Sequence, residues 1–339
     1  PSDYWDHRDA GGTVGGTLTY WDTYSLTGTG TESEPYLVGT ADDLAFISYM
    51  TRRAAAAATN FAGKYFKQTA DIDLAGRNWV PIGTTATGRQ FAGNYDGDNF
   101  EIQNMYAYQT AGSYNSNLYL GLFQSINGAA GEATGTTFIN INITDGHANG
   151  NIGNYVALFA GQVLSARLEN ITVDGIVASW ESDQVGGVLQ GRGNYVAGLV
   201  AIMDNQIFDE NNGIYNCVNN AHVRGRNYVG GIVAQARNTD ITGSVNNAYI
   251  FAETGGQTNS GNYVGGIVAQ VTGTETITFA ELVNNGNIQA VNNSAGGIVG
   301  LSTVGTVRLI IDNSQNFGNS FINNFFFKFF IFSALDFTF

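Results

Sequence analysis

The sequence has little charge and almost no cysteine, and both shortages narrow the choice of folds. Only 12% of the 339 residues are charged, about half of the roughly 25% that is usual. A helical bundle needs charged residues on its solvated faces, so we do not expect one. The single cysteine, Cys217, excludes an intrachain disulfide and lies in an apolar stretch. We interpret it as a small buried residue rather than a reactive thiol.

Basic residues are scarce as well. The chain has 14 Lys and Arg residues against 28 Asp and Glu residues, which gives a net charge of −14. Nucleic acid binding needs cationic groups that release counterions from phosphates, so we expect no nucleic acid partner. The longest apolar run falls short of the ~20 residues that a membrane span needs, so no transmembrane span is expected.

Two common catalytic motifs are missing. The histidines His7, His147 and His222 lie far apart, and the sequence contains neither HExxH nor GxSxG. Zinc peptidases of the first type and hydrolases of the second are therefore excluded. Without another recognisable catalytic set, we predict that the protein is not an enzyme and has no cofactor.

Two Asp-x-Asp pairs leave an alternative open. Asp71 and Asp73 form one pair, and Asp96 and Asp98 form the other. Paired carboxylates can bind calcium or serve a glycosidase. We favour turn and capping roles, because two carboxylates alone do not define a sugar-cleaving site. Calcium binding stays as the alternative.

Glycine and internal repetition are what the sequence has in abundance. Glycine accounts for 45 residues and proline for only 3. The segment NYVGGIVAQ occurs at 227–235 and again at 262–270. Related segments recur every 31 to 40 residues and begin at Asn117, Asn154, Asn194 and Asn293. Repetition at this period indicates similar units stacked in a solenoid.

A second motif alternates with the first. Asn–Asn pairs at 219–220, 246–247 and 284–285 separate short apolar runs. Asparagine tolerates the left-handed backbone of tight corners, so each period predicts about three short strands. We expect an all-β protein in which residues 117–302 form about six three-stranded coils of a parallel β-solenoid, similar to a right-handed β-helix.

Stacked coils place equivalent residues about 4.8 Å apart, which predicts ladders of like side chains. One ladder is aromatic and the other occupies a corner. The aromatic ladder comprises Tyr155, Tyr195, Tyr228 and Tyr263, and the corner ladder comprises Asn219, Asn246 and Asn284.

Residues 1–116 differ from the repeats, and we expect them to cap the solenoid or to form its first irregular coils. Thr40 followed by Asp43 is typical of a capping box, and apolar residues follow at helical spacing, so we predict a helix near 41–57. The remainder of this region predicts irregular strands. Trp5 and Trp21 lie in Tyr-Trp-Asp segments. They either pack inside the cap or form exposed platforms for sugar rings.

Residues 303–339 form an apolar tail. Its phenylalanines include Phe325, Phe326, Phe327, Phe329, Phe330 and Phe332. Exposed, such a segment would aggregate, so it needs a partner. It either closes the last coil of its own subunit or is donated as a strand to the next subunit, and envelope anchoring is a third possibility.

Several short motifs carry a family resemblance. They include GTGTESEPYLV at 28–38, TADDLA at 40–45, WVPIG at 79–83, GLVA at 198–201 and GIVA at 231–234. Over roughly residues 20–302 they resemble bacterial GLUG-repeat surface proteins. The resemblance implies an exported protein with a parallel β-helix-like repeat region and no catalytic residues in the repeats. GLUG repeats occur in adhesin-like proteins and beside the peptidase domains of some immunoglobulin A proteases.

These observations favour a structural role outside a cell that we expect to be prokaryotic. Our leading hypothesis is a subunit of a surface filament or layer, which assembles head-to-tail with copies of itself through the solenoid ends and the tail. The second is a monomeric adhesin-type domain that binds glycan or a host protein. The third is a carbohydrate-active β-helix enzyme.

Overall fold

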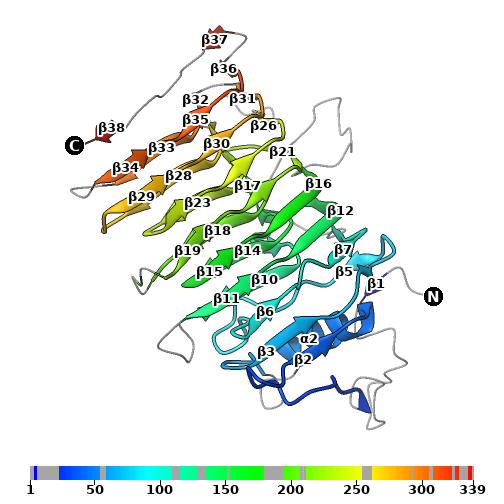
Figure 1. The fold of residues 1–339 in the computed structure, drawn as a ribbon. Coiled ribbons are helices and arrows are strands. Elements are labelled where there is room, and N and C mark those ends of the chain that lie inside the picture. Colours follow the sequence, from blue (N-terminus) through cyan, green and yellow to red (C-terminus); the bar gives the residue numbers. More distant parts are fainter. Residues whose placement is uncertain are drawn as a thin grey trace.

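Parallel β-sheets run along the whole length of the molecule in a computed structural model of the chain (Figure 1). The structure describes residues 4–5, 23–53, 59–108, 115–128, 135–150, 153–178, 194–206, 209, 211–253, 262–291, 293–304, 308–322, 325–327 and 335–337. Almost every strand pairs in parallel with the equivalent strand one repeat further along the chain. With one short helix beside these sheets, the protein is an all-β, solenoid-like molecule, and this part of the predicted fold class is confirmed.

Two large sheets, which we name A and B, extend over most of the described chain. The 16 strands of sheet A are β1 (Tyr4–Trp5), β4 (Ile72–Asp73), β5 (Asn78–Trp79), β7 (Glu101–Gln103), β8 (Tyr106–Tyr108), β12 (Asn142–Asn149), β16 (Thr172–Ala178), β20 (Val218–Asn219), β21 (His222–Gly225), β25 (Val245–Asn246), β26 (Ile250–Ala252), β30 (Val283–Asn284), β31 (Ile288–Ala290), β35 (Gln315–Asn316), β36 (Ser320–Ile322) and β37 (Phe325–Phe327). The 10 strands of sheet B are β2 (Tyr36–Val38), β3 (Tyr65–Gln68), β6 (Asn94–Asp96), β11 (Thr136–Ile139), β15 (Ala166–Glu169), β19 (Gly213–Tyr215), β24 (Asp240–Thr242), β29 (Ile277–Ala280), β34 (Leu309–Asp312) and β38 (Leu335–Phe337).

Two smaller sheets, C and D, contain the NYV-type repeats. The 6 strands of sheet C are β10 (Phe123–Asn127), β14 (Ala160–Leu164), β18 (Val200–Asp204), β23 (Val233–Arg237), β28 (Val268–Gly273) and β33 (Val299–Val304). The 6 strands of sheet D are β9 (Asn115–Leu120), β13 (Gly153–Val156), β17 (Tyr195–Ala197), β22 (Tyr228–Gly230), β27 (Tyr263–Gly265) and β32 (Ser294–Gly296).

Sheets A and B cross both boundaries that the repeats predicted. Sheet B already contains β2, β3 and β6 before residue 117, and it continues with β34 after residue 302. The sheets therefore neither begin at residue 117 nor end at residue 302. The physical reason is that parallel pairing joins backbone groups, so a coil can stack without matching the repeat motif in its side chains.

The core lies between the sheets and is filled by every second side chain of the strands. In β3 and β11 the buried residues alternate with half-buried ones, as a strand with one face on a core requires. Near the first coils the core is aromatic: the rings of Phe66, Phe91 and Phe123 form a chain with centroids 5.5 and 5.3 Å apart.

The helix α2 (Ala41–Arg52) covers the N-terminal end of this core (Figure 1). The predicted capping box is present, because the Thr40 side chain accepts from the Asp43 backbone N–H and Asp43 accepts from the Thr40 N–H. The helix buries Leu44 and Ile47 completely, and its Ser48 hydroxyl donates to the Val80 carbonyl at 2.8 Å. The prediction of a helix is confirmed at 41–52, and residues 54–58 lie outside the described residues.

Two described pieces of the Phe-rich tail pair with their own chain. Strand β37 runs antiparallel to β36, and β38 runs antiparallel to β34. Phe325, Phe326 and Phe327 thus form the outermost strand of sheet A. Phe329, Phe330 and Phe332 lie outside the described residues.

The structure brings the four predicted ladder tyrosines together in sheet D and adds a fifth at the start. Their rings stack with centroids 4.2 to 5.4 Å apart and planes within 16° of parallel. The ladder runs through Tyr119, Tyr155, Tyr195, Tyr228 and Tyr263.

The asparagine ladder is buried and continuous. The amide of Asn246 donates to Asn284 Oδ1 at 2.7 Å and accepts from Asn219 Nδ2 at 2.7 Å. Asn284 donates to Asn316 at the same distance, so the ladder is one member longer than the Asn–Asn motif indicated. Each amide also closes its own corner, as when Asn246 Nδ2 donates to the Ala248 carbonyl at 3.0 Å.

Replacing Asn246 by alanine should lower the free energy of unfolding by about 3 kcal/mol, because it leaves buried groups of Asn219 and Asn284 without partners. The exposed neighbour Asn247, whose amide bonds to Asn220 at 2.9 Å, is the matched control. Asn247→Ala should cost less than ~1 kcal/mol. Denaturant unfolding monitored by circular dichroism measures both, and equal losses would contradict a structural role specific to the buried ladder.

Candidate functional site

The outward side of sheet A carries two rows of side chains in which aromatic and apolar residues alternate with polar ones, and we call these rows the aromatic face. Strands β12, β16, β21 and β26 lie next to one another along one side of the molecule (Figure 1). The first row consists of Tyr106, His147, Ile176, His222 and Tyr249, and the second consists of Tyr108, the buried Asn149 and Ala178, Arg224, Phe251 and Gln289.

Strand alternation explains why these side chains point outward. In β26, Ile250 and Ala252 are buried, and Phe251 between them is not. In β21, Val223 is buried between the outward residues His222 and Arg224. Because the pleat has a period of two, burying one set in the core fixes the other set on the surface.

The aromatic face is unusually apolar for an exposed surface. Ile176 is 50% exposed and Tyr249 is 37% exposed. They are two of the four large apolar residues that are exposed in the described part of the chain, and the others are Leu37 and Phe317. Two such residues in one row, two strands apart, make this surface a candidate binding surface.

The rings of the aromatic face form two groups. The rings of Tyr249 and Phe251 have centroids 6.0 Å apart and planes 12° apart, so they lie nearly parallel. Three strands away, Tyr106 meets the His147 ring edge-on at 5.0 Å. The Tyr249 hydroxyl donates to Gln289 Oε1 at 2.5 Å, which holds that phenol in place.

Charge is nearly balanced on this face. Arg224 lies 5.2 Å from the centroid of the Phe251 ring and forms an ion pair with Glu253. Burial raises the pKa of Tyr249, while Arg224 opposes that shift and Glu253 adds to it. The phenol therefore keeps its proton at neutral pH and can donate a hydrogen bond. Burial also lowers the pKa of His147, which keeps that imidazole uncharged.

The tyrosine ladder presents a different kind of surface. Each inner ring has a neighbour against both of its faces, so a ligand can reach only ring edges and hydroxyls. Burial raises the pKa of Tyr195 to about 12, with a smaller contribution from Tyr228 and Tyr155. The ladder tyrosines stabilise the stack and offer no open ring face between Tyr119 and Tyr263.

The aspartate pairs hold turns. Asp73 accepts from Ala75 N at 2.7 Å and from Asn104 Nδ2 at 2.9 Å, and the Asn104 bond is the main cause of its lowered pKa. Asp96 accepts from the Asp98 backbone at 2.9 Å, and Asp98 pairs with Lys67 at 3.1 Å. Within the described ranges, no cluster of three or more His, Cys, Asp or Glu side chains is arranged to hold a metal ion.

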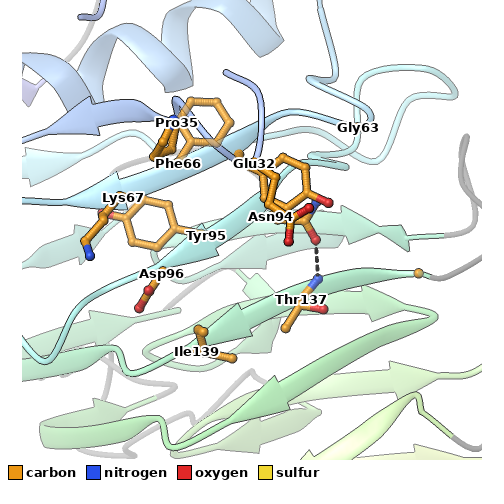
Figure 2. A pocket seen from close by; sticks show the side chains of 12 residues that line it. Glu32, Pro35, Gly63, Phe66, Lys67, Asn94, Tyr95, Asp96, Thr137 and Ile139 are labelled. Carbon is orange, nitrogen blue, oxygen red and sulfur yellow. Dashed lines mark hydrogen bonds between the residues drawn. The ribbon is translucent and has the colours of Figure 1, made fainter. Parts of the chain in front are cut away.

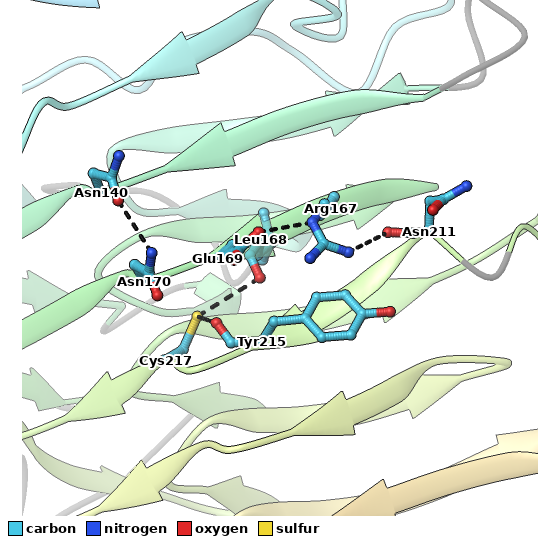
Figure 3. Close-up of polar contacts among 8 residues, drawn as sticks. All are labelled: Asn140, Arg167, Leu168, Glu169, Asn170, Asn211, Tyr215 and Cys217. Carbon is cyan, nitrogen blue, oxygen red and sulfur yellow. Dashed lines mark hydrogen bonds and ion pairs between the residues drawn. The ribbon is translucent and has the colours of Figure 1, made fainter.

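Cys217 is fully buried and lies between β19 of sheet B and β20 of sheet A (Figure 3). Its Sγ lies 3.4 Å from the Tyr215 carbonyl, and burial raises the pKa of the thiol to about 12. The thiol therefore stays protonated at neutral pH, and burial keeps it out of contact with solvent. Above it, the Arg167 guanidinium lies 4.0 Å from the centroid of the Tyr215 ring and pairs with Glu169 at 2.8 Å (Figure 3).

The structure relates the other predicted site residues in ways that the sequence did not show. His147 and His222, far apart in sequence, lie on either side of Ile176 in one row. Strand β1, which contains Trp5, pairs with the strand of Trp79. The Trp5 side chain, Trp21 and His7 lie outside what the structure describes. The aromatic face was not predicted from the sequence. Its only sequence signal is a pair of aromatic residues two positions apart, such as Tyr106 and Tyr108.

Comparison with known proteins identifies the fold alone. No protein-family model matches the sequence, and no curated protein matches it. Among solved structures, the chain is similar to a crystal structure named as a "putative immunoglobulin A1 protease from Bacteroides ovatus", with a TM-score of 0.65 and 18% identity. The match covers 90% of this chain and 82% of that chain. In the described residues, no helix is both long and apolar enough to span a membrane.

Because the pKa of His147 is lowered, we expect the stability of the folded protein to depend on pH. In the unfolded chain this histidine binds protons below its ordinary pKa of about 6.5, whereas the folded protein resists protonation until lower pH. Stability should therefore fall as the pH drops through about 6.5. His147→Gln should remove that part of the loss, measured as midpoint shifts in thermal unfolding between neutral and mildly acidic pH. An unchanged pH slope in the variant would contradict this assignment.

Proposed function

We propose that this protein is a non-catalytic, adhesin-type binding module that holds a neutral glycan chain against the aromatic face. The observation that carries the proposal is the row in which Ile176 and Tyr249 are exposed on sheet A, with the Tyr249 ring nearly parallel to the Phe251 ring. The proposal also includes membership of the GLUG-repeat surface proteins, a location outside a prokaryotic cell, and a right-handed solenoid of about six regular coils.

The chemistry of the aromatic face suits a sugar polymer. The C–H face of a pyranose ring packs on apolar and aromatic surface, and its hydroxyls need donors and acceptors beside that surface. Tyr249 and Gln289 supply such groups next to the Phe251 ring. Successive strands repeat about every 4.8 Å, which is similar to the length of one sugar ring. A rigid sheet also loses little entropy when it binds.

The composition of the face supports a binding role over a catalytic one. The described rows contain histidines but neither serine nor cysteine, so a histidine there has no side-chain hydroxyl or thiol of those residues to activate. Cys217 is buried with a raised pKa. The likeness to a structure named as a protease, at 18% identity, bears on the fold and not on this surface.

Tyr249→Ala should weaken the binding of a neutral polysaccharide by at least about tenfold, because it removes an exposed ring and the hydroxyl bonded to Gln289. A glycan array identifies the ligand, and titration calorimetry measures the affinity. Phe317→Ala is the matched control, because Phe317 is a 54% exposed aromatic outside the face. Parent-like affinity in Y249A, or an equal loss in F317A, would contradict the proposal.

End-to-end assembly is a second candidate, favoured by the C-terminal edge of sheets C and D. In β27 and β28, Val264 and Val268 are fully buried, whereas their partners Ala295 and Val299 in the last coil are half-buried. Within the described chain, β32 and β33 are the last strands of their sheets. A parallel edge with apolar residues is a template for another strand. At the opposite end, α2 covers the core, which is why a head-to-tail filament ranks second.

If the second candidate holds, the parent protein should form particles larger than one subunit in solution. Val299→Lys should then reduce them to monomers, because a charge would enter the apolar junction. Ile176→Lys, on the lateral face, should leave the assembly intact. Light scattering coupled to size exclusion measures the mass, and electron microscopy detects filaments. A monomeric parent would rule out assembly through this edge under the conditions used.

A further inference from the structure

A groove of about 620 Å³ lies against sheet B, whereas the aromatic face belongs to sheet A. Strands β3, β6 and β11 line it, and residues of the preceding loop, Glu32 and Pro35, reach it from one side (Figure 2). We propose that this groove is a second binding site, which takes one neutral disaccharide unit. The inference rests on the groove's own residues and does not depend on the aromatic face.

The outward side chains of the three strands form a grid in register. Tyr65 pairs with Asn94, and Lys67 pairs with Asp96, which pairs in turn with Ile139. Thr137 completes the grid beside Asn94. Neighbouring strands are about 4.8 Å apart, and alternate residues along a strand are about 7 Å apart. The grid therefore covers about 7 by 10 Å, an area that suits two linked sugar rings.

A donor and an acceptor are fixed at the centre of the grid. Asn94 Oδ1 accepts from the Thr137 backbone at 2.9 Å, which orients the amide (Figure 2). Asp96 Oδ1 accepts from Asp98 N at 2.9 Å and from Asn140 Nδ2 at 3.1 Å. Among the described residues, Asn94 Nδ2 and Asp96 Oδ2 have no protein partner. Sugar hydroxyls both donate and accept, so one preset donor beside one preset acceptor matches them.

Apolar walls complete the groove. Tyr65 provides an aromatic ring, and Pro35 and Ile139 provide aliphatic surface. These groups can pack on the C–H faces of a sugar while its hydroxyls reach the central pair. A site with a few placed polar groups among apolar walls is the usual form of a small-ligand site.

The charges of the groove select against acidic sugars. Glu32 and Asp96 contribute two carboxylates, and the single cation, Lys67, already pairs with Asp98 at 3.1 Å. A uronic acid, sialic acid or phosphate would meet uncompensated negative charge. A neutral sugar would not, and the net charge of −14 on the whole chain acts in the same direction.

Backbone hydrogen bonds within the chain shape the groove, so a ligand does not need to induce that shape. The loop closes on itself, because Gly30 N donates to the Glu34 carbonyl at 3.0 Å, and Tyr65 N donates to the Gly30 carbonyl at 3.1 Å. The backbone at Gly30 has a φ of +72°, a conformation that favours glycine. The loop is thereby tied to β3, the strand that carries Tyr65 and Lys67.

Titration calorimetry and saturation-transfer NMR with cellobiose, maltose, lactose and N,N′-diacetylchitobiose test the proposal. We expect saturable binding of at least one of these disaccharides, and at least about tenfold weaker binding of a uronic-acid disaccharide. Tyr65→Ala should weaken the binding by about tenfold, and the isosteric Asp96→Asn should weaken it by a similar factor. Circular dichroism establishes that both variants are folded.

The aromatic-face variant Tyr249→Ala separates this site from the first one. Its disaccharide affinity should equal that of the parent, even if it has lost polysaccharide binding. No saturable binding of any of the four disaccharides would overturn the proposal. So would parent-like affinity in both Y65A and D96N, or a loss of disaccharide binding in Y249A alone. If an unstructured peptide binds at the groove and none of the disaccharides competes with it, the groove would be assigned to a protein partner instead.

Discussion

Inside the solenoid, the second glycine of each Gly-Gly pair packs tightly against a buried asparagine of the next motif. A Cβ atom at Gly231 would lie 2.7 Å from Asn246 Cγ, and a Cβ atom at Gly266 would lie 2.7 Å from Asn284 Nδ2. Real Cβ atoms do not approach other atoms so closely. The glycine therefore makes room both for the asparagine ladder and for the backbone of the next coil, because the same Cβ atoms would lie 2.1 Å from the Gly266 and Gly297 carbonyl oxygens. The Gly-Gly motif and the Asn–Asn motif therefore pack directly against each other.

This contact explains how the surface can vary while the stack stays regular. Corners held by Asn246 and its equivalents fix the register of the strands that follow, because each amide bonds to the coils on both sides. A fixed register lines up outward side chains in rows whatever their identity. Sheet A uses its rows for exposed rings, sheet B lines a polar groove, and sheet D stacks tyrosines. We infer that the solenoid is a scaffold on which binding surfaces are placed by register.

Much of the repeat architecture could be predicted from the sequence, and much of the binding surface could not. The tyrosine ladder was visible because Tyr195, Tyr228 and Tyr263 recur within one motif. The helix was visible through Thr40 and Asp43. The aromatic face was not visible, because Tyr106, Ile176 and Tyr249 share neither a motif nor a residue type, and the loops between coils vary in length. Only the strand pairing places them in one row. The extent of sheet B could not be fixed from the sequence for a related reason, since its first strands pair through the backbone without a repeated side-chain pattern.

Hydroxyl-radical footprinting with and without a neutral polysaccharide shows whether a glycan covers the aromatic face, because it reports the exposure of individual side chains. If the aromatic face binds the ligand, the ligand should protect Tyr106, Ile176, Tyr249 and Phe251 from oxidation and leave the exposed Phe317 unchanged. Protection confined to β32 and β33, or equal oxidation of the aromatic face with and without every polysaccharide tested, would contradict this binding.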